Sequence, residues 1–258
     1  MSIAIGFVAR TGIVLGTDSR VTTTFPEGKT REDAYPKLIQ YGDLPIALAM
    51  VGAGFYGGRD FRALISETTW AQKDDSPTTV EGVARAFAEV AGGIARDSGA
   101  ADSHTMTVLV AGFSPGQAFG ELWQVTLPKG EVRLMARDTQ TIVWRGRSDA
   151  VKTLWWGADL HALGHALKSN GVDDAVGAKV MDDLKKAAGW GPERTNWGMP
   201  LSTAVELVRF QLEVQIQAER FLPGRDACGA PTQILAINSA GLRWIDRPFP
   251  DFLSGTGR

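Results

Sequence analysis

A serine at position 2 and an aspartate at position 18 flank a short segment made of apolar and turn-forming residues. A serine hydroxyl is a weak nucleophile that needs a base beside it, and a free α-amino group at the start of a chain is one such base. The initiator methionine is normally removed when a small residue follows it, so loss of Met1 would leave the Ser2 hydroxyl beside its own amine. These residues predict an N-terminal nucleophile that attacks a carbonyl carbon while the amine accepts the proton.

Two short strands must position these residues. Apolar runs over residues 3–8 and 13–16 flank a polar turn that ends at Gly12, which is the pattern of a β-hairpin. Ser2 then precedes the first strand and Asp18 follows the second.

The rest of the chain alternates between strand and helix patterns. Residues 22–35 are polar and are expected to form an irregular loop. Further strands are expected over 37–40, 44–51, 105–113, 121–126, 132–137, 142–145, 232–238 and 242–245, and helices over 57–72, 79–96, 150–188 and 200–221. We find no repeat or linker, and this order predicts an α+β domain with layered sheets over residues 1–258, in which 248–258 is a loose tail.

Composition is typical of one globular enzyme domain. The 258 residues are 44% apolar and 22% charged, with a net charge of −2 that argues against nucleic acid or an anionic membrane as partner. Cys228 is the one cysteine, so no internal disulfide can form, and no secretion signal or membrane-spanning run is evident. We therefore expect a cytoplasmic protein.

The sequence gives no reason to expect a metal or a cofactor. His161 and His165 have the spacing of zinc ligands on a helix, but no glutamate lies between them and no third ligand is evident. The glycines at positions 52 and 54 lack the strand-to-helix context of a nucleotide-binding loop.

The segment G-I-V-L-G-T-D-S-R, residues 12–20, resembles the N-terminus of proteasome-type β subunits. It is similar to bacterial members of that group such as the ancestral β-subunit proteins, Anbu. The resemblance is close over residues 2–20, extends to about residue 57 and is looser beyond. It implies an N-terminal nucleophile (Ntn) hydrolase fold, a four-layer αββα sandwich of two stacked antiparallel sheets, with Ser2, Asp18 and Arg20 at positions of the family motif.

The resemblance also implies the remaining site residues. Lys37 is the candidate cation that pairs with Asp18 and lowers the pKa of the Ser2 amine, ordinarily about 7.7 to 8.0. It lies three residues later than the family spacing. The oxyanion donor would be a backbone N–H at Gly52 or Gly54. Family members also carry supporting residues in two later turns, where this chain has Ser148, Asp226 and Cys228; we interpret Cys228 as packing.

We therefore expect a serine/threonine-type Ntn peptidase that hydrolyses peptide bonds in peptides or unfolded proteins with Ser2 after Met1 removal. The resemblance implies a homo-oligomer, either a ring or a helical assembly, whereas an ATP-dependent unfoldase partner is not indicated. Two alternatives stay open: a small-molecule amidase or acylase on the same fold, and a non-catalytic assembly subunit. Each site residue also has a plainer interpretation, with Asp18 as a turn carboxylate and the glycines as strand-to-helix punctuation.

Overall fold

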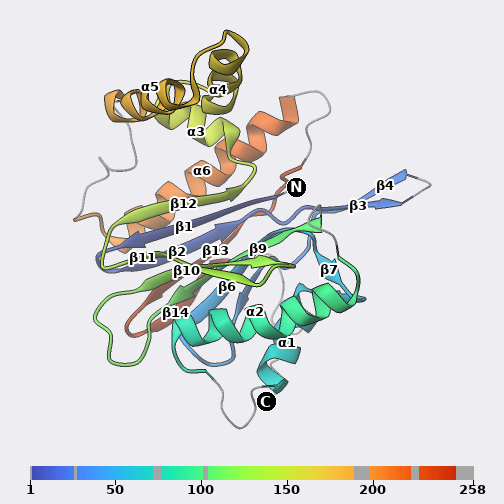
Figure 1. Ribbon diagram of the computed structural model, residues 1–258. Coiled ribbons are helices and arrows are strands. Elements are labelled where there is room, and N and C mark those ends of the chain that lie inside the picture. Colours follow the sequence, from blue (N-terminus) through green and yellow to red (C-terminus); the bar gives the residue numbers. More distant parts are fainter. Residues whose placement is uncertain are drawn as a thin grey trace.

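Two five-stranded antiparallel sheets are stacked in the computed structural model, which describes residues 2–25, 28–71, 77–100, 104–188, 198–221 and 227–247 (Figure 1). The first, which we call the N-terminal sheet, contains β12 (Thr141–Gly146), β1 (Ile3–Ala9), β2 (Gly12–Thr17), β13 (Gln233–Asn238) and β14 (Gly241–Asp246) in spatial order. The second sheet contains β11 (Glu131–Arg137), β10 (Glu121–Leu127), β9 (Met106–Gly112), β6 (Ile46–Gly52) and β5 (Leu38–Gln40).

Helices cover the outer face of each sheet (Figure 1). The second sheet is covered by α1 (Phe61–Ala71) and α2 (Val80–Asp97), and the N-terminal sheet by α3 (Asp149–Trp156) and α6 (Leu201–Phe221). The Thr79 hydroxyl accepts a hydrogen bond from Gly82 N–H at 3.0 Å and so defines the start of α2. The α+β fold class and its four-layer order of helix, sheet, sheet and helix are confirmed.

Strand alternation explains why β1 is apolar at every position. Successive side chains of a strand point to opposite faces of its sheet. Ile3, Ile5 and Phe7 pack toward α6, whereas Ala4 and Val8 pack between the two sheets. Both faces of the strand are therefore buried.

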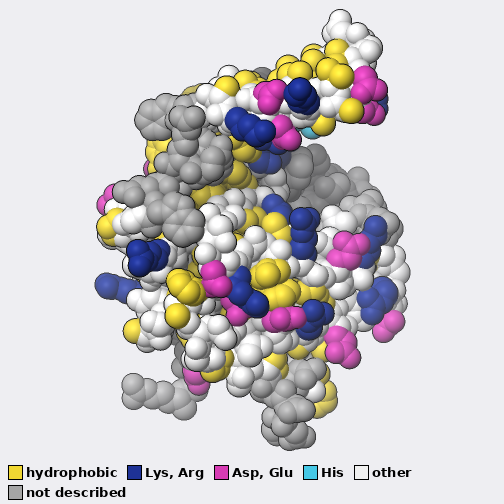
Figure 2. Space-filling model, turned by 60° about the vertical axis from the view of Figure 1, so that its left-hand side comes forward, with side chains coloured by type: hydrophobic (Ala, Val, Ile, Leu, Met, Phe, Trp, Pro, Cys, Tyr) yellow, Lys and Arg dark blue, Asp and Glu magenta, His cyan; other side chains and the backbone are white. Residues whose placement is uncertain are grey.

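The helix pair α4 (Leu160–Ser169) and α5 (Asp174–Ala187) lies outside these layers, at the top of Figure 1. Neither helix contains a buried residue, and Val176 and Val180 on α5 are 54% and 40% exposed. Hydrophobic and charged side chains are both visible on this pair at the top of Figure 2. The helical segment expected over 150–188 is thus three helices, of which only the first packs on the sandwich core.

The prediction of an irregular loop over residues 22–35 is wrong. The structure has a hairpin there, formed by β3 (Val21–Phe25) and β4 (Gly28–Glu32). The β-branched run from Val21 to Thr24 favours extended backbone, a local preference that the polar composition concealed. Two further short strands, β7 (Phe55–Tyr56) and β8 (Arg59–Asp60), precede α1. Among the described residues, no helix combines the length and the hydrophobicity needed to cross a bilayer.

Candidate active site

The pairing of β1 with β2 brings Ser2 and Asp18 to the same end of the N-terminal sheet. Ala4 is opposite Thr17, so the residues that precede β1 lie beside those that follow β2. Ile3 N–H donates to Asp18 Oδ1 at 3.0 Å, and Asp18 N–H donates to the Ile3 carbonyl at 3.3 Å. The Asp18 side chain is thereby fixed against the residue that follows Ser2.

Lys37 reaches this point from the other sheet, because it directly precedes β5. Its Nζ donates to Ser2 Oγ at 2.7 Å, to Asp18 Oδ1 at 2.9 Å and to the Arg20 carbonyl. Ser2 is 4% exposed, and Asp18 and Lys37 are fully buried. The structure therefore brings together the three residues that the sequence singled out from two separate segments.

Burial and pairing act in opposite directions on this ion pair. Burial lowers the pKa of Lys37 and the charge of Asp18 raises it, with the result below the ordinary value. Burial likewise raises the pKa of Asp18 against the effect of Lys37 and of N–H groups from Ile3 and Gly229. For each group, burial outweighs the pairing, so both pKa values are shifted in the direction that disfavours the charged form.

Gln233, at the start of β13, is a residue that the sequence analysis missed. It is 1% exposed, and its Oε1 accepts hydrogen bonds from the N–H groups of Lys37 and Leu38, both at 3.1 Å. Its Nε2 donates to Ser19 Oγ at 2.9 Å and to the Tyr35 carbonyl at 2.8 Å. One buried amide thus ties the backbone of Lys37 to the N-terminal sheet. The available signal was a single polar residue opening the apolar strand Q-I-L-A-I.

The two candidate oxyanion glycines differ in their structural role. Gly52 ends β6 with φ +101°, and a Cβ there would collide with the Thr105 carbonyl oxygen. Gly54 accepts a hydrogen bond from the Tyr35 hydroxyl at 3.3 Å through its carbonyl. A side chain at position 52 would therefore displace the end of the strand, while the identity of the oxyanion donor stays a prediction.

Ser148 lies beside the site because β12 pairs with β1. Ile3 is opposite Gly146, and the Arg147 N–H donates to the Ser2 carbonyl at 2.7 Å. Gly146 has φ +73°, and a Cβ there would collide with the Ser2 carbonyl oxygen. Ser148 is 1% exposed and occupies the residue before α3, where its side chain does not cap that helix. Its role in the chemistry stays a prediction.

The turn before β13, which the sequence predicts to support the site, contacts Asp18 through its backbone. Gly229 N–H donates to Asp18 Oδ2 at 3.0 Å, and Ser19 N–H donates to the Gly229 carbonyl at 3.0 Å. Cys228 is 2% exposed, and burial above all raises the pKa of its thiol, which disfavours the reactive thiolate. Asp226, expected as a supporting residue, lies outside the described residues.

Within the described residues there is no group of three or more His, Cys, Asp or Glu side chains placed to hold a metal ion. His161 and His165 are exposed on α4. The Lys37 ammonium, held by a carboxylate and donating to a serine oxygen, is instead able to stabilise negative charge that develops on that oxygen.

No protein-family model matches the sequence, and a search of curated proteins finds no match. Solved structures do match along nearly the whole chain. Anbu (ancestral beta-subunit) from Yersinia bercovieri superposes with a TM-score of 0.58 and 12% identity, covering 97% of this chain and 89% of that one. A mutant of Anbu from Hyphomicrobium sp. strain MC1 superposes with a TM-score of 0.61 and 13% identity, covering 95% of this chain and 85% of that one. The chain therefore has the fold of the Anbu proteasome-like proteins, and the resemblance drawn from residues 2–20 is confirmed at the level of the fold.

Proposed function

We propose that this chain is an Ntn hydrolase that cleaves amide bonds in peptides or unfolded proteins, with Ser2 as its nucleophile once Met1 is removed. The observation that carries the proposal is the 2.7 Å contact of Lys37 Nζ with Ser2 Oγ. The same ammonium binds Asp18 in a fully buried pair, an arrangement that a purely structural serine does not require. The Anbu-like fold supports a hydrolase of this kind.

In the acylation step, the neutral Ser2 amine accepts the hydroxyl proton while Oγ attacks the substrate carbonyl carbon. Lys37 stabilises the developing negative charge on Oγ and, as a neighbouring cation, keeps the pKa of the amine low enough for a neutral fraction near pH 7. We assign the backbone N–H of Gly52 or Gly54 to the oxyanion that forms.

The intermediate collapses when the ammonium of Ser2 returns its proton to the leaving nitrogen. The C–N bond breaks, and an ester between Ser2 Oγ and the acyl part of the substrate remains. A water molecule then attacks that ester, the Ser2 amine accepts one of its protons, and transfer of that proton to Oγ releases the acid. The amine therefore serves as base and then as acid in each half of the cycle.

Removal of Met1 is the decisive test. With Met1 retained, the Ser2 nitrogen is a peptide amide that cannot accept a proton, so an N-terminally tagged protein should be inactive. A C-terminally tagged protein whose terminus is Ser2 by intact mass should hydrolyse fluorogenic peptides, and Ser2→Thr should keep part of that activity. Equal hydrolysis by both tagged forms would rule out this mechanism.

We also propose that the chain self-associates, an expectation that rests on the family resemblance. Size-exclusion chromatography with light scattering should then give several times the chain mass of 27.7 kDa. A monomer at micromolar concentration would favour the small-molecule amidase alternative over a proteasome-like peptidase.

A further inference from the structure

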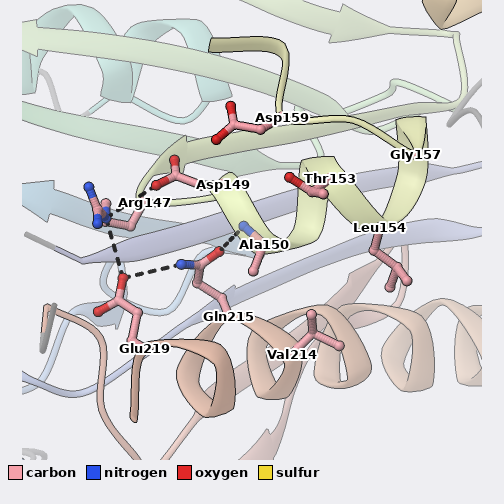
Figure 3. A pocket seen from close by; sticks show the side chains of 10 residues that line it. All are labelled: Arg147, Asp149, Ala150, Thr153, Leu154, Gly157, Asp159, Val214, Gln215 and Glu219. Atoms are coloured by element: carbon pink, nitrogen blue, oxygen red, sulfur yellow. Dashed lines mark hydrogen bonds and ion pairs between the residues drawn. The ribbon is translucent and has the colours of Figure 1, made fainter. Parts of the chain in front are cut away.

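A cavity of about 650 Å³ lies between α3 and α6, and one of its lining residues, Arg147, binds the Ser2 carbonyl through its backbone N–H. Figure 3 shows the side chains of Arg147 and Glu219 directed toward one another at one side of this cavity, with Gln215 beside them. Arg147 and Asp149 flank Ser148 in the chain, so this wall of the cavity adjoins the candidate active site.

Glu219, near the end of α6, is only 2% exposed, and both of its carboxylate oxygens accept hydrogen bonds. Its Oε2 accepts the N–H groups of Ala227 at 2.6 Å and Cys228 at 2.8 Å. Its Oε1 accepts Gln215 Nε2 at 3.1 Å and Arg147 Nε at 3.4 Å. A carboxylate that collects this many donors is held in one orientation.

The same hydrogen-bond donors also favour the charged form of Glu219. Burial by itself raises the pKa of Glu219, but the hydrogen bonds from Cys228, Ala227 and Gln215, together with the Arg147 charge, lower that pKa below its ordinary value. Glu219 is therefore an anion at neutral pH, and the mechanism above gives it no part in proton transfer.

The groups that bind Glu219 belong to the two segments that frame the site. On one side, the residue after Cys228 is Gly229, whose N–H donates to Asp18. On the other side, Arg147 donates its backbone N–H to the Ser2 carbonyl. One side chain thus joins the segment that orients Asp18 to the segment that orients Ser2, from outside the sheet.

We propose that Glu219 is a positioning residue, which sets the separation of Ser2 and Asp18 by anchoring Arg147 and residues 227–228 to α6. The inference rests on the proposed function, since it concerns the alignment of the same nucleophile. Glu219 acts only through these two segments, so its loss should impair the alignment of the reacting groups more than the binding of substrate.

The Glu219→Gln variant tests this directly, because it preserves shape but replaces one accepting oxygen with an NH₂ group that faces other donors. We expect kcat to fall about 10²-fold, the loss that a misplacement of about 1 Å produces, with KM nearly unchanged. Glu213→Gln is the matched control: Glu213 lies on the same helix and is exposed, and its substitution should leave both constants unchanged. Wild-type kcat in Glu219→Gln would overturn the proposal.

Chemical rescue separates positioning from a general loss of packing. In Glu219→Ala, the missing carboxylate leaves space that is continuous with the cavity, so added formate should restore part of kcat. Formate should not rescue Glu219→Gln, where the amide fills that space. Absence of any rescue in a folded Glu219→Ala protein would contradict the positioning role.

Hydrogen exchange distinguishes failure of this inference from failure of the proposed function. In Glu219→Gln, the amides of residues 227–229 should exchange faster than in Glu213→Gln, whether or not the wild type hydrolyses peptides. Unchanged exchange would overturn the positioning role, whereas changed exchange with an inactive wild type would reject only the hydrolase. If Glu219→Gln does not fold, Arg147→Met should show the same selective loss of kcat, and its absence would overturn the proposal.

Discussion

Asp18 and Glu121 are both buried carboxylates with several hydrogen-bond donors, yet they are held by different kinds of cation. Asp18 binds Lys37, which is fully buried and also donates to a serine oxygen. Glu121 binds Arg137 at 2.9 Å, whose side chain is 42% exposed. The Glu121 carboxylate also accepts Trp123 Nε1 at 2.8 Å and Ser114 Oγ at 3.0 Å.

The two clusters lie at opposite ends of the second sheet. Glu121 pairs with Gly112, which in turn pairs with Ile46 at the beginning of β6. The Lys37 carbonyl accepts a hydrogen bond from Met50 N–H near the other end of β6. A similar set of residue types, a serine, a carboxylate and a cation, therefore occurs twice on one scaffold.

The two clusters differ in how deeply their cation is buried. For Glu121, burial raises the pKa, but hydrogen bonds from Trp123, Arg137 and Ser114 outweigh it and lower the pKa overall. For Asp18, burial prevails and the pKa is raised. An exposed arginine keeps its charge in water and stabilises the anion, whereas a buried lysine is itself destabilised as a cation. Glu121 is thus favoured as an anion, whereas burial disfavours the charged form of both Asp18 and Lys37.

Replacing the serine of each cluster by alanine should produce the largest difference between the clusters. Ser2→Ala should abolish hydrolysis, by roughly 10⁶-fold in kcat, the loss that follows removal of a nucleophile. Ser114→Ala should leave kcat unchanged but lower the free energy of unfolding by about 1–3 kcal/mol, because it leaves the Val80 N–H without its acceptor. Peptide hydrolysis and urea unfolding of both variants measure this. Comparable loss of activity in the two proteins would remove the distinction between the clusters.

Breaking the buried ion pair should have the next largest effect. Lys37→Met and Asp18→Asn should each lower kcat by about 10²–10³-fold, since electrostatic help at the reacting oxygen is lost. Each single variant also leaves an unpaired buried charge, which costs about 3–5 kcal/mol of stability. The double variant should regain stability without regaining activity, as measured by urea unfolding and kcat. Recovery of both would mean that the pair is structural.

The smallest expected effect is a pH-dependent difference in stability at Glu121. The folded-state pKa of Glu121 lies below its ordinary value of 4.5, so its contribution to stability is fully present above the unfolded-state pKa and is lost as the pH falls through the folded-state pKa. Wild type should exceed Glu121→Gln by about 1–3 kcal/mol at pH 7. Urea unfolding curves of the two proteins should converge as the pH falls below the folded-state pKa of Glu121, and kcat should be equal at pH 7. A difference that persists at low pH would contradict the assigned charge.

Local patterns were sufficient to predict the part of the site that depends on one hairpin. The apolar runs around Gly12 define the register that places Asp18 against the residue after Ser2, and the order of strands and helices predicts the layers. Lys37 came from the family resemblance, because no local pattern relates the start of β5 to the N-terminus.

The residues that were missed act between segments far apart in the chain. Gln233 lies 196 positions from Lys37, and Glu219 occurs in a helix that also carries exposed glutamates at positions 206 and 213. A helix pattern alone does not show which of these carboxylates is buried against residues 227–228. Such contacts depend on the packing of the layers, which sequence periodicity does not encode.

Lys37 directly precedes a strand of one sheet, whereas Ser2 and Asp18 adjoin strands of the other. A partly unfolded state that keeps its strands and helices but loses the packing between sheets would separate the ammonium from the hydroxyl. The proposed hydrolysis would then report on the cooperative tertiary transition, and we expect it to disappear with the near-ultraviolet circular dichroism signal, before the far-ultraviolet signal is lost. The same separation means that no isolated fragment carrying only one of the sheets can contain the complete site.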